Sequence, residues 1–390
     1  MIKIAKEQCV GCGACEQACP KNCITMEADS EGFLYPNIDK DKCIDCHICE
    51  QSCPVINSKQ DKAECEPKAF AAYCKDEAIR EASSSGGIFT LLSEAILRQG
   101  GVVFGAAFDD DGLVCHIAVD KPEDLHKLRG SKYLQSRTEN TYSEAKAVLE
   151  SGRPVLYSGT PCQIEGLRAF LKKEYDNLYT QDLICHGCPS PKLWKKYLTY
   201  RENCAGAPAQ RMFFRHKKNG WKTYSLSLSF DNDKEYVQVL SKDLYMQMFL
   251  QNICLRPSCY QCSFKKLNRV SDITLADFWS CDKYVPEMDD NKGCSAVVVY
   301  SEKGERLIKQ IQPQIISKEI TISQVLDGNP SMIKACDKPR RRDAFMNSLD
   351  TMEIPELAEK YLIKPSFKSK LGKHIPDGIK KQIKRALRMD

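Results

Sequence analysis

Apolar and polar residues follow two different periods along this chain, and each period predicts one kind of element. Between residues 88 and 98, apolar side chains recur at the spacing of a helix face, at Ile88, Leu91, Leu92, Ala95 and Ile96. Short apolar runs bounded by turn residues predict strands instead. In chain order, the pattern predicts strands at 69–74, 102–108, 113–119, 154–157, 178–184, 211–215, 224–230, 236–240, 273–276 and 296–300, and helices at 88–98, 138–151, 162–171 and 191–202.

This order of elements also predicts how the chain is divided. Strands alternate with helices up to about residue 202, which is typical of a partly parallel sheet covered by helices. The three strands between 211 and 240 are expected to pair antiparallel. Residues 24–39 predict a short hairpin, and the polar stretch that ends at Pro67 predicts a linker. We therefore expect one domain at 1–58, a linker at 59–68, a second domain at 69–325 and a basic helical extension at 326–390.

The first domain contains the motif C-x2-C-x2-C-x3-C-P twice, from Cys9 to Pro20 and from Cys43 to Pro54. Three cysteines on one tight loop can hold three irons of a [4Fe-4S] cluster, and the cysteine before proline serves the other cluster. Two zinc sites would need the same number of thiolates, but the doubled spacing with both Cys-Pro endings favours clusters. The predicted ligands are Cys9, Cys12, Cys15 and Cys53 for one cluster, and Cys43, Cys46, Cys49 and Cys19 for the other. This domain resembles bacterial two-cluster ferredoxins, and Cys23 is left without a predicted role.

Composition and charge narrow the classes of protein to which this chain can belong. The 390 residues include 22 cysteines, but no secretory signal precedes Cys9, so the thiols are expected to be metal ligands or buried groups in a reducing cytoplasm. No apolar run approaches the roughly 18 residues of a membrane span. The net charge of +5 is small and dispersed over most of the chain, which argues against nucleic acid as a partner.

A second group of cysteines lies in the larger domain. Cys162 stands at a strand-to-helix turn, Cys185 ends an apolar strand, and Cys259 and Cys262 form a C-x2-C pair. These four could hold a third cluster, and the helix that opens at Cys162 would place free N–H groups near it. Cys254 competes with Cys259, and Cys188 competes with Cys185. Spacing alone does not decide between a cluster and scattered buried thiols.

From about residue 69 to residue 300, the chain resembles the beta-subunit family of coenzyme F420 hydrogenases and dehydrogenases. The matching stretches are Ser84-Ser-Gly-Gly87, Arg129-Gly-Ser-Lys-Tyr133, Gly159-Thr-Pro-Cys-Gln163, Leu183-Ile-Cys185, Cys259-Tyr-Gln-Cys262 and Asp272-Ile-Thr-Leu-Ala-Asp277. The resemblance implies FAD and a third [4Fe-4S] cluster with Cys162, Cys185, Cys259 and Cys262 as ligands. One departure is Ala276-Asp-Phe-Trp-Ser280, where the family often has A-D-x-x-G. We expect an α+β protein, a small bacterial-type ferredoxin domain with two [4Fe-4S] clusters fused to a larger mixed α/β flavin and iron-sulfur domain.

Electron counting supports the flavin independently. Each cluster passes one electron, whereas organic substrates exchange hydride, so a converter such as flavin must stand between them. The predicted phosphate cradle is Ser84, Ser85, Gly86 and Gly87 before a helix, where N–H groups and the positive dipole end converge. Arg129, Gly130, Ser131 and Lys132 are predicted to contact the pyrophosphate. The simpler alternatives are a serine cap of the helix and a solvated loop. His186 is a candidate proton donor, against the commoner structural role.

The end of the chain is basic. Lys338-Pro-Arg-Arg-Arg342 is one cluster, and Ile375, Ile379, Ile383 and Leu387 recur every four residues among lysines and arginines. Such a helix can lie on an anionic membrane surface or dock on a partner protein. A solvated helix packed on its own domain is the alternative that we favour.

Together these observations predict a cytoplasmic iron-sulfur flavoprotein oxidoreductase. It would pass electrons between a ferredoxin-like donor and an organic hydride acceptor, an F420-type deazaflavin or another small substrate, through three [4Fe-4S] clusters and FAD. One alternative is a non-enzymatic electron-relay subunit of a larger complex. Another is a cysteine-rich zinc scaffold in surface-polysaccharide biosynthesis.

Overall fold

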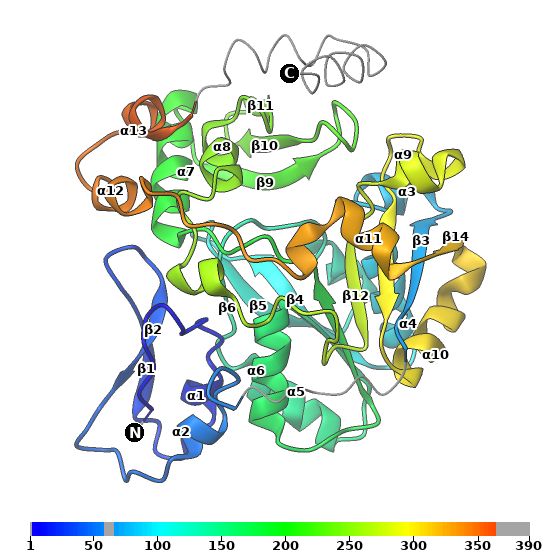
Figure 1. Ribbon diagram of the computed structural model, residues 1–390, viewed down its shortest axis with the longest axis horizontal. Coiled ribbons are helices and arrows are strands. Elements are labelled where there is room, and N and C mark those ends of the chain that lie inside the picture. The colour runs from blue at the N-terminus through cyan, green and yellow to red at the C-terminus, as the bar shows by residue number, and fades with distance from the viewer. Residues whose placement is uncertain (1, 58–65, 364–390) are drawn as a thin grey trace, which may run out of the picture.

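The computed structural model describes residues 2–57 and 66–363, and it begins with a small cysteine-rich unit. Strands β1 (Ile24–Ala28) and β2 (Leu34–Ile38) form the predicted antiparallel hairpin, in which Ile24 lies opposite Ile38. The short helices α1 (Ala14–Gln17) and α2 (Ile48–Gln51) begin inside the two cysteine motifs. This unit lies against α5 and α6 of the larger part (Figure 1).

The larger part is built on one mixed sheet. Within the described residues it has nine strands, in the order β14-β3-β13-β12-β8-β7-β4-β5-β6. The central neighbours β12, β8, β7 and β4 run parallel, β5 and β6 are also parallel, and the other pairs are antiparallel. The strands are β3 (Lys68–Cys74), β4 (Val102–Phe108), β5 (Val114–Val119), β6 (Ser136–Arg137), β7 (Val155–Ser158), β8 (Leu178–Leu183), β12 (Ile273–Asp277), β13 (Ser295–Val299) and β14 (Ile315–Ile320).

Alternate residues of these strands bury on opposite faces of the sheet, as the two-residue period requires. Val103 packs with α4 (Ile88–Leu97) and α10 (Glu302–Ile311) on one face. Phe104 packs with α5 (Thr141–Glu150) and α6 (Pro161–Leu171) on the other. Ala14 of α1 belongs to the core of the second face, so the ferredoxin-like unit shares a core with the larger part.

A second, three-stranded antiparallel sheet comprises β9 (Ala209–His216), β10 (Ser225–Phe230) and β11 (Glu235–Val239). The antiparallel prediction for this stretch is confirmed, but the strands form a sheet of their own. Helices α7 (Pro191–Ala205) and α8 (Leu244–Leu250) pack on it through a large aromatic core. Helices α12 (Arg342–Asn347) and α13 (Ile354–Tyr361) complete this core, so the described part of the extension is packed rather than solvated.

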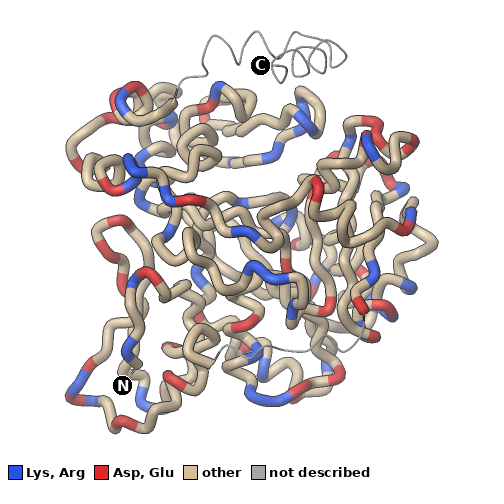
Figure 2. Tube along the Cα trace, in the orientation of Figure 1, with Lys and Arg blue, Asp and Glu red and all other residues tan. Residues whose placement is uncertain are grey.

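The remaining elements are short. Helices α9 (Cys281–Tyr284) and α11 (Ile322–Gly328) pack against β3 and β13, and α3 (Glu77–Glu81) contacts β3. Short 3-10 turns lie at Pro122–Lys127, Pro257–Gln261, Pro286–Met288, Gln312–Gln314 and Pro330–Met332. Charged residues of both signs are interspersed along the described trace (Figure 2). None of the helices in the described ranges is long and apolar enough to cross a bilayer. The basic repeat at 375–387 lies outside the described residues.

Candidate redox site

The cysteines of the first domain form two groups, one of which comprises Cys9, Cys12, Cys15 and Cys53, while the other comprises Cys19, Cys43, Cys46 and Cys49 together with Cys23. Burial raises the pKa of the Cys12 thiol to about 12 and raises that of Cys15, and negative charge on Cys9 and Cys53 raises both pKa values as well. These four thiols therefore lie close enough to interact. The helix α1 begins at Gly13, whose φ of 74° is readily adopted by glycine, and this turn brings Cys12 and Cys15 together.

The second group surrounds a hollow of about 20 Å³ that is lined by Cys19, Cys23, Cys43, Cys46 and Cys49. Cys46 is exposed and Cys43 is half-buried, whereas the cysteines of the first group are buried. Cys23, to which the sequence assigns no role, lies with its Sγ 3.3 Å from the Sγ of Cys19. The spacing rule could not find it, because Cys23 lies outside the repeated motif. Iron binding by both groups stays a prediction.

One cavity has a volume of about 660 Å³ and opens at the ends of the parallel strands. Ser158, Leu183 and Asp277, at the carboxyl ends of β7, β8 and β12, all line it. Crevices at this edge of an open parallel sheet are the usual position of ligand sites. Val10 and Gly11 of the first domain also line the cavity, so it extends to the first cysteine motif.

The second-domain cysteines meet in this cavity. Its lining includes Cys162, Cys185, Cys188, Cys259 and Cys262, which comprise the predicted ligands and one of the two rivals. Burial raises the pKa of the Cys162 thiol well above its usual range, and the charges of Cys262, Cys185 and Cys259 raise it further. Among the described residues, no three cysteine, histidine or carboxylate side chains are gathered as ligands of a single metal ion.

The two rival cysteines differ in position. Cys254 is completely buried in the aromatic core that contains α7 and α8, and it is not part of the cavity lining. The backbone N–H of Cys188 donates to the Cys259 sulfur at 3.3 Å, so Cys188 stays close to the predicted ligands. The geometry therefore favours Cys259 over Cys254, and it leaves the choice between Cys185 and Cys188 to experiment.

Local structure holds two of these cysteines in place. Cys162 lies in the first turn of α6, which opens with a capping box between Thr160 and Gln163, and the Thr160 hydroxyl is 3.1 Å from the Cys162 sulfur. The ammonium group of Lys265 donates to the carbonyl oxygens of Cys185 at 2.6 Å and of Ser331 at 3.0 Å. Lys265 therefore connects the loop after β8 with the start of the C-terminal extension.

The two stretches predicted to bind a pyrophosphate lie side by side at the cavity. The backbone N–H of Ser131 donates to the Ser84 hydroxyl at 2.7 Å, although 47 residues separate them. Ser85 donates to the carbonyl of Cys294 instead of capping α4, and the N-cap is Gly87 with φ 85°. The alternative of a serine cap is therefore wrong, and no side chain caps this helix end beside the cavity.

Arg129 and Lys132, the two cations of the second predicted pyrophosphate-binding stretch, differ in their hydrogen bonding. The Arg129 Nε is buried and has no hydrogen-bond partner among the described residues, whereas a buried guanidinium is normally paired. Lys132 donates to the carbonyl oxygens of its own loop, with the shortest bond, 2.9 Å, to that of Arg129. Burial lowers the pKa of Lys132 to about 7. Both residues and Gly130 line the cavity, as do Ser84, Ser85 and Gly87; Gly86 is absent from that lining and donates its N–H to Ser295.

His186 lies at the cysteine end of the cavity. Its Nε2 is 2.6 Å from Asn252 Oδ1, and the thiol of Cys336 lies 3.1 Å from its carbonyl oxygen. Burial lowers the pKa of its imidazole, which favours the neutral form. In the neutral ring the single proton lies on Nε2 and is donated to the Asn252 oxygen, so Nδ1 can only accept a proton. The catalytic role of His186 as a proton donor stays a prediction.

A buried polar network in the lining of the cavity was not predicted. Arg215 makes a bidentate ion pair with Asp277, with N–O distances of 2.6 and 2.9 Å. Trp221 donates to the same carboxylate at 2.7 Å and stacks on Trp279. Asp277 belongs to a stretch that carries the family resemblance, but the residues that bind it come from β9 and the loop after it, so spacing gave no signal.

A second unpredicted group is His116 on β5. Its Nδ1 is 2.7 Å from the Ser136 hydroxyl, its Nε2 is 3.0 Å from the Ser158 carbonyl, and its ring stacks on Tyr157. Burial lowers the pKa of His116 to about 4, so the ring is neutral at ordinary pH. Its Nε2–H therefore donates to Ser158, which orients the loop that leads to Cys162.

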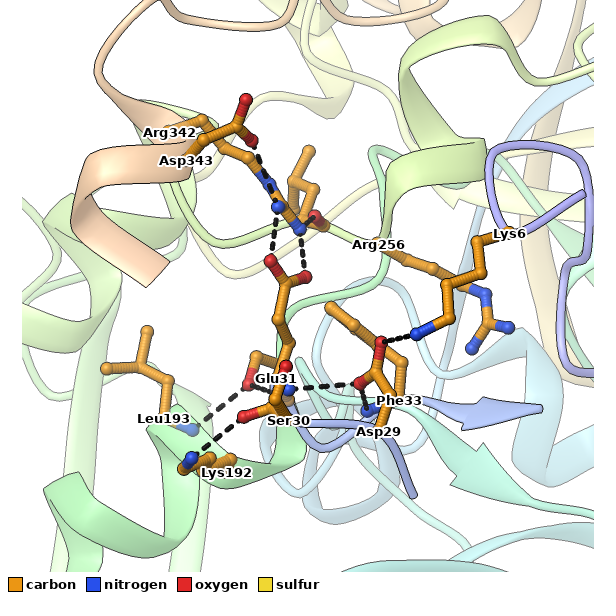
Figure 3. A network of polar contacts seen from close by, with 12 residues as sticks. Lys6, Asp29, Ser30, Glu31, Phe33, Lys192, Leu193, Arg256, Arg342 and Asp343 are labelled. Atoms are coloured by element: carbon orange, nitrogen blue, oxygen red, sulfur yellow. Dashed lines mark hydrogen bonds and ion pairs between the residues drawn. The ribbon is translucent and has the colours of Figure 1, made fainter. Parts of the chain in front are cut away.

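Basic residues from three separate segments hold the first domain against this site (Figure 3). Arg342 of α12 binds Glu31 at the tip of the β1–β2 hairpin. Lys192 of α7 donates to the Ser30 carbonyl at 2.7 Å. Arg256 donates to the carbonyl oxygens of Cys9 and Leu34, both at 2.8 Å. The ferredoxin-like unit is thus fixed on the larger domain, in agreement with the shared core.

Family models match three parts of the chain. Residues 8–57 match the 4Fe-4S dicluster domain, residues 69–141 match "Coenzyme F420 hydrogenase/dehydrogenase, beta subunit N-term", and residues 152–324 match the corresponding C terminus. No curated protein matches the chain. Among solved structures, a chain of the F420-reducing [NiFe] hydrogenase complex from Methanosarcina barkeri is similar, with 17% identity, a TM-score of 0.46, and coverage of 75% of this chain and 89% of that one.

Proposed function

We propose that this chain, which belongs to the coenzyme F420 hydrogenase/dehydrogenase beta-subunit family, is an FAD-dependent oxidoreductase. The family and the 4Fe-4S dicluster domain together make it an iron-sulfur electron-transfer protein. It would exchange electrons between a ferredoxin-like donor and an organic hydride acceptor. The observation that carries the proposal is that one cavity is lined both by the predicted pyrophosphate-binding stretches and by the predicted ligands of a third cluster.

The residues at this cavity suit the groups proposed for it. A volume of about 660 Å³ is within the range of cofactor pockets, roughly 300–1,000 Å³. The uncapped start of α4 and the unpaired Arg129 Nε offer donors to a pyrophosphate. Cys162, Cys185, Cys259 and Cys262 would hold the third cluster. When bound, the clusters would supply one-electron steps and FAD the conversion to hydride transfer.

The burial of the cysteines indicates at which end of the protein electrons would enter and at which end they would leave. Cys9, Cys12, Cys15 and Cys53 are buried, Cys12 belongs to the core shared with the larger domain, and the Cys9 carbonyl accepts from Arg256. Cys46 of the other group is exposed. We therefore expect a donor protein to dock near Cys46, and the organic acceptor to enter the cavity of the larger domain. Because the family is described by coenzyme F420, a deazaflavin is the first acceptor to test.

Anaerobic purification followed by cofactor analysis tests this proposal. We expect about four irons for each of three clusters, FAD released on denaturation, and reduction of a deazaflavin, NAD(P)+ or another acceptor in a panel. Iron without flavin would overturn the enzyme proposal and support the relay subunit. Colourless protein with stoichiometric zinc would support the scaffold.

A further inference from the structure

Arg256 is a buried arginine that contacts both cysteine-containing regions. Its backbone N–H donates to the Cys188 carbonyl at 2.8 Å, and its own carbonyl accepts from the Cys259 N–H at 2.9 Å. Its Nε donates to the Cys9 carbonyl across the domain boundary, also at 2.8 Å. One residue therefore connects a predicted ligand of the first cluster with the loop of a predicted ligand of the third.

The charge of Arg256 is not matched by a carboxylate. Its side chain, in a residue that is 1% exposed, contacts the neutral Gln135 and backbone carbonyls and lies against Tyr35, 4.3 Å from the ring centre. In the described parts of the chain, no carboxylate lies within ion-pair distance of it. A buried cation without a counterion is costly, so a compensating negative charge is expected nearby.

The thiolate-ligated clusters proposed on either side of Arg256 would carry such a negative charge. The positive charge of Arg256 acts on Cys12 on one side and on Cys188 and Cys259 on the other, lowering the pKa of each thiol against the larger effect of burial. Cluster potentials depend on net charge and on nearby hydrogen bonds. A cation shared by two sites favours the reduced, more negative state of both.

We infer that Arg256 is a positioning residue that fixes the separation of the inner ferredoxin cluster and the third cluster and raises the reduction potential of both. This inference rests on the proposed function, because it needs the third cluster. The outer site, at Cys19, Cys43, Cys46 and Cys49, has no contact with Arg256 and should be insensitive to it.

The test is an anaerobic redox titration of full-length Arg256→Gln, followed by electron paramagnetic resonance. We expect two of the three cluster potentials to shift to more negative values while the iron content is kept, with a smaller shift in Arg256→Lys. Lys192→Gln is the control, because it removes another cation from the same interface, where Lys192 binds the Ser30 carbonyl and Asp350 rather than a predicted ligand loop. It should shift no cluster potential.

A second variant covers the case in which Arg256→Gln does not fold. Gln135→Glu places a carboxylate 2.9 Å from the guanidinium, so it should neutralise the charge in place and lower the same two potentials. Unchanged potentials in foldable Arg256 and Gln135 variants, or equal shifts in Lys192→Gln, would overturn the inference. A wild-type protein that lacks the third cluster would instead refute the proposed function.

Discussion

Arg342 and Glu31 form a bidentate ion pair that joins the C-terminal extension to the first domain of the chain. The Arg342 side chain is 4% exposed and that of Glu31 is 18% exposed. Arg342 also donates to the Leu255 carbonyl at 2.9 Å, one residue before Arg256. The family models end at residue 324, so these contacts of Arg342 with the first domain come from a segment outside the family models.

We expect Arg342→Gln to destabilise the docked first domain by about 3 kcal/mol, because it leaves a mostly buried carboxylate without its partner. Hydrogen exchange of the β1–β2 hairpin in the full-length protein measures this effect. Lys338→Gln is the control, since its pair with Asp343 is exposed and should contribute less than about 1 kcal/mol. Equal effects of the two substitutions would contradict the prediction that Arg342 stabilises the docked first domain.

The ligand choice in the cavity is tested by single serine substitutions. Cys162→Ser should lose about four irons per chain and disturb flavin binding, while the spectroscopic signals of the ferredoxin domain stay. Cys254→Ser should keep all iron, because Cys254 lies in an apolar core outside the cavity. Comparison of Cys185→Ser with Cys188→Ser then tests the fourth ligand, for which we expect Cys185. Iron loss in Cys254→Ser but not in Cys259→Ser would refute the assignment.

Cys43→Ser separates the two halves of the proposed reaction. We expect it to abolish flavin reduction by a ferredoxin donor, because it removes a predicted ligand of the outer cluster. Hydride exchange between flavin and the organic acceptor should stay, since Cys43 is far from the cavity lining. Stopped-flow absorbance with each substrate measures both rates. Normal reduction by the donor would show that the ferredoxin domain is bypassed.

His116 should make the protein sensitive to acid. Its pKa is lowered from 6.5 to about 4 by burial, so the unfolded chain binds the extra proton between these values. The stabilisation is therefore complete above pH 6.5 and is lost as the pH falls toward 4. Between pH 7.5 and pH 5 this loss amounts to about 2 kcal/mol.

Denaturant unfolding of wild type and His116→Gln at several pH values measures this pH-dependent loss of stability. The variant should be less stable than wild type at pH 7.5, because glutamine cannot reproduce the bonds to Ser136 and Ser158. The difference should narrow by about 2 kcal/mol at pH 5. A constant difference across this range would show that the pKa of His116 is not depressed.

Regular patterns in the sequence predicted much of the fold. The two cysteine motifs, the hairpin at β1 and β2, and the strands and helices from β3 to β13 follow from local periods, except for the short elements α3, β6, α8 and α9, which were not predicted. The edge strand β14 was missed because only its end residues, Ile315 and Ile320, are buried. Helix α13 is itself acidic, and it was missed because it lies between the basic clusters at 338–342 and 364–388, whose charge was the stronger signal.

The site was predictable only where its residues share a local motif. Ser84 and Ser131 were both named, but their hydrogen bond depends on the packing of elements 47 residues apart. Arg256 and Arg342 look like ordinary charged residues in the sequence, and only the docking of the first domain buries them. The roles of such residues follow from long-range packing, which spacing does not encode.

The close cover over Gly11 has a consequence for maturation of the protein in the cell. A Cβ at this position, where φ is 65°, would lie 2.4 Å from Gln135 Nε2 and 2.8 Å from Arg256 Nη1, so these two side chains closely cover the loop of the inner cluster, which is reached only from the adjoining cavity. The predicted inner ligands are buried whereas Cys46 is exposed, so iron and sulfide should reach the outer site more easily once the domains have met. We expect chemical reconstitution of folded apoprotein to fill the outer site first, and faster filling of the inner site would show that the domains separate readily.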